Sequence, residues 1–271
     1  MSTGCRPLWP AETIWQVVEP LLPAFSVEIL PEIDSTNTEL MRRIRAGRAE
    51  PTLLVAERQT AGRGRLGRQW QADAGASLTF SLTLPLAPQD WSGLSLAVGV
   101  SVADSLHSAI KIKWPNDLWL DDRKLAGILI ETASIEGQRH AVIGVGINIT
   151  PRTGDGMSTP PASLQELLPE IGAAEALERI AAPLVKALLA FERSGFEAFR
   201  AAFARRDLLK GRPLVTSDGT NGMGQGVDET GALLLATRTE VRRINSAEVS
   251  VRPAGGAFDT TASAVPRPQG S

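Results

Sequence analysis

The chain has 271 residues, of which 43% are hydrophobic, so it is long enough to fold as one large domain with a smaller one. Its 28 Lys and Arg residues nearly balance 30 Asp and Glu, and the net charge of -2 does not favour a polyanion such as DNA as a partner. Cys5 is the single cysteine, which excludes an internal disulfide framework. Met1 to Pro10 lacks a basic region followed by an apolar run, and no stretch of about 18 apolar residues occurs, so we do not expect an export leader or a membrane span. We therefore expect a cytoplasmic protein that does not enter a membrane.

Two helices are predicted in the first fifty residues. One is expected around Ala11 to Leu22. The second opens within Asp34 to Glu39, where Thr36 and Glu39 have the spacing of a capping box, and Gly47 ends it.

Strands and a buried helix are expected next. Thr52 to Ala56 is a short apolar run suited to a buried strand, and the alternation from Ser77 to Leu84 predicts a strand with one buried face. Trp91 to Ile110 has apolar residues at helical spacings, which predicts a largely buried helix. Lys111 to Trp114 begins another strand.

The second half changes character twice. Leu125 to Thr132 and Ala141 to Thr150 predict an antiparallel strand pair. From Ser163 to about Leu209 the pattern is helical, and beyond Gly211 short strands recur between turn signals. The residues from about Ala254 onward are rich in Gly, Ala, Ser, Thr and Pro, and we expect them to be disordered.

Residues Gly62 to Gly67 satisfy the pattern G-x-G-x-x-G, which is associated with dinucleotide binding. That site requires a helix after the glycines, but the segment from Gln69 to Ala76 leads into a strand, so the dinucleotide hypothesis fails. The glycines and the three arginines of residues 62–68 would instead form a loop of backbone N–H groups and guanidinium groups suited to phosphate and carboxylate oxygens. A solvated surface loop and an RNA-binding tail are the alternatives, and the position between two core strands favours a binding loop.

A second polar cluster follows the strand at Lys111. Lys113 to Asp117 places an amide and a carboxylate directly after that strand. A two-residue turn at Asp121-Asp122 predicts that Asp117 opposes Ala126 and shares one sheet face with Lys124. Such a group can hold a phosphate and Mg²⁺, although an ordinary ion pair is the simpler interpretation of these residues alone.

Asn148 is out of place in the apolar strand from Gly144 to Ile149. Buried amides usually satisfy structural hydrogen bonds, yet Gly144 and Gly146 would let a ligand or another backbone approach closely. Together with the two clusters, this strand predicts an anion- and metal-binding face without a nucleophile.

Several segments of the chain occur in the order and spacing of one family, namely residues 34–37, 59–70, 113–117, 124–129 and 144–148. Together they resemble the biotin protein ligases, that is, biotin–[acetyl-CoA-carboxylase] ligases. The resemblance runs from about Ile33 to Arg252. Its last part, Gly226 to Leu235 and Ser246 to Arg252, looks like the small C-terminal SH3-like barrel of the family.

The resemblance implies an α+β fold, with a class II synthetase-like mixed sheet flanked by helices at residues 31–209 and the SH3-like domain at residues 210–253. Residues 1–30 would be a lead-in and residues 254–271 a disordered tail. Bifunctional members carry an N-terminal winged helix-turn-helix, and the thirty or so residues before Asp34 are too few for it. The chain therefore looks like a monofunctional ligase that does not bind DNA.

The resemblance also implies the reaction. The family joins the biotin carboxylate to the α-phosphate of ATP with Mg²⁺ present, and then passes the biotinyl group to a lysine of the biotin carboxyl carrier protein of acetyl-CoA carboxylase. A homodimer paired through the central sheet is possible in this family. The alternatives are a lipoate–protein ligase, which shares the catalytic fold, and a non-catalytic regulator that binds biotinyl-AMP.

The same resemblance assigns site residues. The expected biotin-binding set is Ser35, Thr36, Asn37, Gln59, Gly62, Arg63, Gly64, Arg65, Lys124 and Gly127. The expected ATP-binding set is Arg65, Arg68, Trp70, Asn116, Asp117, Lys124 and Asn148. Arg65, Arg68 and Lys124 would act in catalysis, and Asp117 and Asn148 are the candidate Mg²⁺ ligands.

Overall fold

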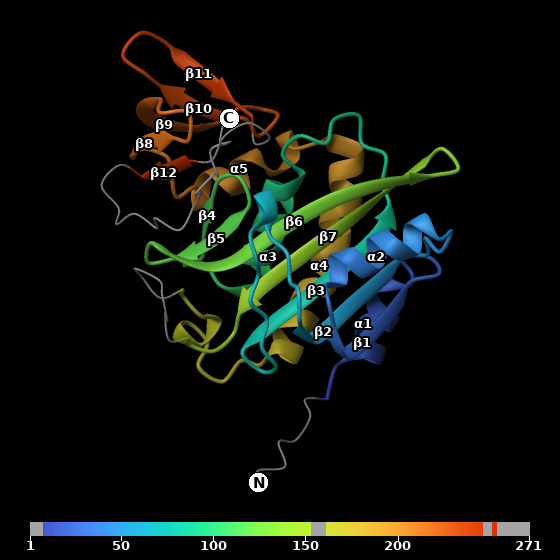
Figure 1. Cartoon of the computed structure of the whole chain (residues 1–271). Coiled ribbons are helices and arrows are strands. Elements are labelled where there is room, and N and C mark those ends of the chain that lie inside the picture. The colour runs from blue at the N-terminus through green and yellow to red at the C-terminus, as the bar shows by residue number, and fades with distance from the viewer. Residues whose placement is uncertain (1–7, 153–160, 246–250, 254–271) are drawn as a thin grey trace, which may run out of the picture.

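The computed structural model describes residues 8–152, 161–245 and 251–253. A seven-stranded sheet forms the centre of the molecule (Figure 1). Its strands, in spatial order, are β1 (Ser26–Ile33), β2 (Thr52–Gln59), β3 (Ser77–Pro85), β7 (Gln138–Asn148), β6 (Arg123–Ile135), β5 (Asp117–Leu120) and β4 (Lys111–Lys113). The β1–β2 pair is parallel and the other pairs are antiparallel, so the sheet is mixed, as expected.

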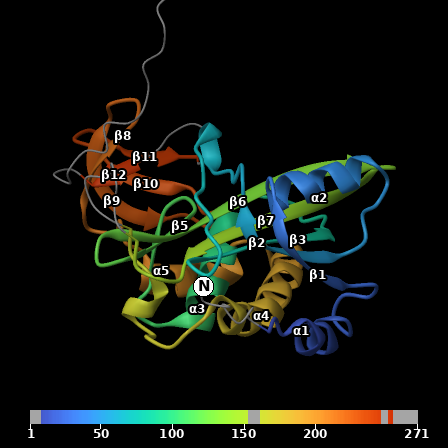
Figure 2. The ribbon, with the colours of Figure 1, turned by 60° about the horizontal axis from the view of Figure 1, so that its bottom comes forward.

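Helices cover both faces of this sheet (Figure 2). The α-helices are α1 (Ala11–Val18), α2 (Thr36–Arg45), α3 (Leu94–Leu106), α4 (Ala173–Ser194) and α5 (Glu197–Arg206), with short 3-10 turns η1 (Arg65–Gly67) and η2 (Leu164–Glu166). Helix α2 lies on one face, and α3 and α4 pack together against the other. Among the described residues, no helix is both long and apolar enough to span a membrane.

A smaller antiparallel sheet follows α5 and lies beside the β4–β5 end of the large sheet (Figure 1). Its strands, in spatial order, are β11 (Val241–Ile244), β10 (Leu233–Ala236), β9 (Asn221–Val227), β8 (Pro213–Thr216) and β12 (Val251–Pro253). The expected combination of a mixed sheet with flanking helices and a small C-terminal β module is therefore confirmed. The predicted disordered tail, residues 254–271, lies outside the described residues.

Strand β3 differs from its prediction because both of its faces are buried. Leu78, Phe80 and the leucines that alternate with them pack into the main core with α3 and α4. The polar face lies under α2, where Thr79 Oγ1 donates to Ala56 O at 2.9 Å and Thr83 Oγ1 donates to Ala141 O at 3.1 Å. Because these hydroxyls donate hydrogen bonds to backbone carbonyl oxygens of the neighbouring strands, this polar face can be buried.

The start of α2 also differs from the expected capping box. Ser35, rather than Thr36, is the N-cap, and its hydroxyl accepts from Thr38 N at 3.4 Å. Glu39 pairs with Arg43 at 2.9 Å instead of closing back on the cap. With Ser35 as the N-cap, the side chains of Thr36 and Asn37 contact Ser81 of the sheet.

The β5–β6 hairpin contains a β-bulge that the sequence did not predict. The Asp121-Asp122 turn has positive φ at both residues, which suits a two-residue hairpin. However, Leu118 pairs with Ala126 and Asp117 pairs with Gly127, because Leu125 is an extra residue on β6. The expected pairing of Asp117 with Ala126 was therefore wrong by one residue.

Candidate functional site

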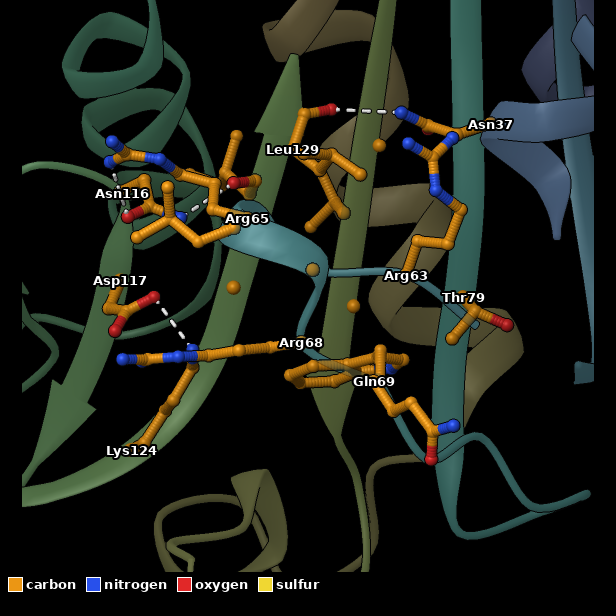
Figure 3. Close-up of a pocket in the computed structure, with 18 of the residues that line it drawn as sticks. Asn37, Arg63, Arg65, Arg68, Gln69, Thr79, Asn116, Asp117, Lys124 and Leu129 are labelled. Atoms are coloured by element: carbon orange, nitrogen blue, oxygen red, sulfur yellow. Dashed lines mark hydrogen bonds and ion pairs between the residues drawn. The ribbon is translucent and has the colours of Figure 1, made fainter. Parts of the chain in front are cut away.

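A pocket of about 370 Å³ lies on the face of the sheet that α2 partly covers, and the loop of residues 62–68 crosses it (Figure 3). It extends from the start of α2 and the end of β2, across β3, β7 and β6, to the segment between β4 and β5. Of the residues expected in the site, it brings together Ser35, Thr36, Asn37, Gln59, Arg63, Gly64, Arg65, Arg68, Trp70, Asn116, Asp117, Lys124 and Gly127.

The end of the pocket near α2 is rich in hydrogen-bonding groups, and the cation at this end, Arg63, is paired with Glu131 at 3.1 Å. Gln59 Oε1 accepts from the backbone N of Thr36 at 2.8 Å. Ser81 Oγ lies 2.7 Å from Thr36 Oγ1 and 2.6 Å from Asn37 Oδ1, and all three residues are buried. Asn37 Nδ2 donates to Leu129 O at 3.2 Å (Figure 3). This network fixes the rotamers of the wall before any ligand arrives.

The floor of the pocket is made by two glycines of β7, and side chains of the protein lie against them. A Cβ at Gly144 would lie 2.2 Å from Asn37 Oδ1, and one at Gly146 would lie 2.3 Å from the Trp70 ring. The close approach expected at these glycines is therefore made by side chains in this structure. The Trp70 indole Nε1 is buried here and has no hydrogen-bond partner among the described residues.

The loop over the pocket is held by its own backbone. Gly64 N donates to Arg68 O at 2.7 Å, and Trp70 N donates to Gly62 O at 2.9 Å. Gly67 has a φ of 73°, a left-handed conformation that favours glycine. No α-helix follows the loop before β3, which agrees with the rejection of a dinucleotide site.

The other end of the pocket is an ion-paired cluster (Figure 3). Lys124 Nζ lies 2.8 Å from Asp117 Oδ1, so the two share a face, as predicted. Asn116 Nδ2 donates to Ile128 O at 2.8 Å, and Asn116 Oδ1 accepts from Arg65 at 3.2 Å. Burial lowers the pKa of the Arg65 guanidinium, against the opposing effect of Asp117.

The charges that line the pocket are strongly unequal. Asp117 is the one acidic residue among the described lining residues. The cationic lining residues are Arg63, Arg65, Arg68, Lys113 and Lys124. A half-buried surface with this excess of cations suits an anionic ligand such as a phosphate or carboxylate.

Two of the expected residues do not line the pocket. A Cβ at Gly62 would lie 2.3 Å from Trp70 O, so this glycine permits a close turn of the loop itself. Asn148 is buried, and its Nδ2 donates to Ala162 O at 3.1 Å and to Lys124 O at 3.4 Å. Its role as an Mg²⁺ ligand stays a prediction.

Sequence reasoning missed several residues that the fold brings to the pocket. Thr79 and Lys113 line it, and Ser217 reaches it from the turn after β8 in the small sheet. Glu131 contacts Asn37 and Arg63 from β6. Lys113 lies in a motif that the sequence had singled out, whereas no local pattern marks Ser217 or Glu131.

The mixed sheet, the cation-lined pocket and the small C-terminal sheet are found in a chain whose sequence matches ligases of the biotin and lipoate type. Residues 29–148 match the Biotin/lipoate A/B protein ligase family, and residues 215–252 match the Biotin protein ligase C terminal domain. The second match includes residues 246–250, which lie outside the described part of the structure.

Comparison with individual proteins identifies the biotin branch of this family. The bifunctional ligase/repressor BirA of Escherichia coli is 36% identical over 246 residues, which cover 84% of this chain and 75% of BirA. The biotin–[acetyl-CoA-carboxylase] ligase of Paracoccus denitrificans is 32% identical over 82% of this chain and 98% of its own. The biotin protein ligase of Aquifex aeolicus in complex with biotin and ATP superposes with a TM-score of 0.73 at 28% identity, covering 84% of this chain and 99% of that one. The chain belongs to the biotin protein ligase family.

Proposed function

We propose that the protein activates biotin as biotinyl-5'-AMP and then transfers the biotinyl group to a lysine of a carrier domain, that of acetyl-CoA carboxylase. The observation that carries this proposal is the contrast between the two ends of one pocket. Uncharged hydrogen-bonding side chains and the Arg63–Glu131 ion pair lie at the α2 end, whereas Arg65 and Lys124 lie beside Asn116 and Asp117 at the β4–β5 end. Biotin combines a neutral ureido ring with a carboxylate, and ATP brings a triphosphate to that carboxylate.

The α2 end would bind the ureido ring. Ser35, Thr36 and Gln59 carry hydroxyl and amide groups there, and Asn37 supports the wall from below. Arg63 and Gly64 of the loop would lie above the ring and the chain that leads to its carboxylate. The carboxylate would then point along the sheet toward Lys124.

The cationic end would bind the phosphates. In the first step a carboxylate oxygen of biotin attacks the α-phosphorus of ATP, and the bond to pyrophosphate breaks. Arg65 and Arg68 would offset the repulsion between the two anions, and Lys124 would bridge the carboxylate and the α-phosphate as charge develops. In the second step the carrier lysine amine attacks the acyl carbon, and AMP leaves.

Mg²⁺ fits this end of the pocket as a partner of the triphosphate. It commonly takes one or two carboxylates and completes its shell with waters and phosphate oxygens. Asp117 offers one such carboxylate, and no cluster of three or more His, Cys, Asp or Glu residues that could hold a metal by itself occurs in the described ranges. When bound, the ion would neutralise phosphate charge, and Asp117 would orient it.

The test is ligation with defined components. The purified protein is incubated with biotin, MgATP and a biotin carboxyl carrier domain, and the mass of the carrier domain is measured by intact mass spectrometry. We expect a mass increase of one biotinyl group that depends on ATP and on the acceptor lysine. Lipoate in place of biotin is the control, and it should give no adduct.

Two results would contradict the proposal. A lipoyl adduct formed in preference to a biotinyl adduct would place the protein with the lipoate ligases. Tight biotin binding without any carrier modification would indicate a regulator that only binds the adenylate.

A further inference from the structure

The side chain of Trp114 joins the pocket to the small C-terminal sheet. Trp114 follows β4 directly and exposes only 1% of its surface. Its Nε1 donates to the carbonyl oxygen of Gly231 at 3.0 Å, although the two residues are 117 positions apart. Trp114 begins the segment that continues through Asn116 to Asp117, so a contact with the second sheet holds the start of a pocket wall.

Gly231 is packed so closely that no other residue would fit. Its φ is 83°, and a Cβ at this position would lie 2.8 Å from the Cα of Gly93 and 3.2 Å from a methyl group of Leu96. Gly93 precedes α3, and a Cβ there would lie 2.5 Å from the ring of Phe196 at the start of α5. The turn from Asp228 to Ala232 is therefore inserted against two helix starts of the large unit.

The carboxylate of Asp228 builds this turn. It is buried, and Oδ1 accepts from Thr230 N at 2.9 Å, from Thr230 Oγ1 at 2.8 Å and from Ala232 N at 2.9 Å. Oδ2 pairs with the guanidinium of Arg243. Burial alone would raise the pKa of Asp228, but the bonds from Arg243, Thr230 and Ala232 hold that pKa below its ordinary value. The turn thus presents the Gly231 carbonyl in a fixed direction.

We propose that the turn of residues 228–232 is a positioning element for the nucleotide end of the pocket. By fixing Trp114, the turn sets the places of Asn116 and Asp117, which in turn bond Arg65 and Lys124. Trp114, Asp228 and Gly231 are positioning residues in this sense. The inference rests on the proposed function, because that function assigns this end of the pocket to ATP.

The geometry also predicts which substrate is affected. The biotin wall is built by α2 and the end of β2, on the opposite side of β3 and β7 from the Trp114 segment. None of the hydrogen bonds described for Ser35, Thr36 or Gln59 involves the small sheet. Loosening the turn should therefore weaken ATP use selectively.

The first experiment removes the indole donor. Trp114→Phe keeps an aromatic ring in the core but has no N–H for the Gly231 carbonyl. We expect the KM for ATP to rise about tenfold, the order of a lost buried hydrogen bond, while the KM for biotin stays within about twofold. The control is Trp15→Phe on α1, which removes the hydrogen bond that Trp15 Nε1 donates to Phe25 O at 3.1 Å. This change should alter neither the KM for ATP nor the KM for biotin.

A second variant changes the turn that carries Gly231 instead of Trp114 itself. It tests the role of the turn even if Trp114→Phe does not fold. Asp228→Asn places an amide against Arg243 and touches no lining residue that binds substrate. The same selective rise in the KM for ATP is expected, with thermal unfolding measured alongside to follow the loss of structure. Unchanged KM values for ATP, or equal changes in both KM values, overturn the proposal.

Wild-type activity separates this inference from the proposed function. If the wild-type chain does not ligate biotin with ATP, the proposed function fails. If it does so and Asp228→Asn leaves the KM for ATP unchanged, only the role of the turn fails.

Discussion

At the scale of single residues, Glu131 couples the loop to the wall beneath it. Its Oε2 accepts from Asn37 Nδ2 at 3.0 Å, and its Oε1 lies 3.1 Å from an Arg63 guanidinium nitrogen. The side chain of Glu131 is 22% exposed and that of Arg63 is 48% exposed. One carboxylate therefore contacts both a buried amide of the wall and a half-exposed cation of the loop, so loss of its charge should weaken the attachment of the loop to the wall.

We predict that Glu131→Gln releases the acyl-adenylate faster, by up to about fivefold, because a partly exposed ion pair contributes at most about 1 kcal/mol. The measurement is the fraction of labelled biotinyl-AMP that stays with the protein after rapid desalting. Glu32→Gln is the control, since it breaks the exposed pair with Arg58, 2.7 Å apart on the edge of the sheet. Equal retention in wild type and Glu131→Gln would show that Arg63 is held by other contacts.

At the scale of elements, strand β7 forms the floor because it lacks side chains at two positions. Gly144 and Gly146 face the pocket while the residues between and around them face the core. Strand alternation places both glycines on the same face. The missing side chains allow Asn37 and the Trp70 ring to lie on the backbone itself.

Gly144→Ala should weaken biotin binding by roughly 10- to 100-fold, since the new methyl group displaces the Asn37 amide and leaves buried polar groups unpaired at a cost of about 1–3 kcal/mol. Isothermal titration with biotin measures the effect. Gly172→Ala is the matched control, because a Cβ there meets nothing within 4 Å. Similar losses of affinity in both variants would contradict the role of the floor.

The same scale shows what the sequence could predict. Strands β2, β3 and β7 were expected because local apolar patterns mark them. Strand β1 was missed, since Glu28, Pro31 and Glu32 interrupt its pattern, and these residues are tolerated because β1 is a half-buried edge strand. The pocket residues were expected from motifs, but Ser217 and Glu131 depend on tertiary contacts that no short segment encodes.

At the scale of the whole molecule, Asp207 lies at the junction between the two sheets. It ends α5, its Oδ1 accepts from Leu209 N at 2.8 Å, and the next residue, Leu208, donates its N to Ile112 O at 2.9 Å. Burial raises the pKa of the Asp207 carboxyl, although the backbone bonds from Leu209 and Lys210 act in the other direction. The charged form of Asp207 is therefore a cost to the folded state.

Asp207→Asn should raise the Tm at neutral pH by about 1–2 °C, on the order of half a kcal/mol for a chain of this size. The folded-state pKa lies above the ordinary 3.8, so the free energy of unfolding of the wild type falls as pH rises from 3.8 through the folded pKa. The amide that replaces the carboxyl does not titrate, so the free energy of unfolding of Asp207→Asn should not decrease for this reason over the same pH range. Thermal unfolding at pH 7 and again below 3.8 measures it, and a gain of equal size at both values would exclude a charge effect.

The extra residue Leu125 sets the phase of β6. Lys124 and Gly127 are three residues apart and would lie on opposite faces of a strand without a bulge; because the bulge takes up Leu125, both face the pocket, as do Leu129 and Glu131. The side chain of Leu125 is buried in the core, so a similar apolar residue should serve there. Deleting Leu125 would make the ladder regular and leave Lys124 and Gly127 two residues apart, still on the pocket face, but it would remove a buried leucine from the core. The bulge thus adds an apolar side chain to the core without moving the lysine out of the pocket.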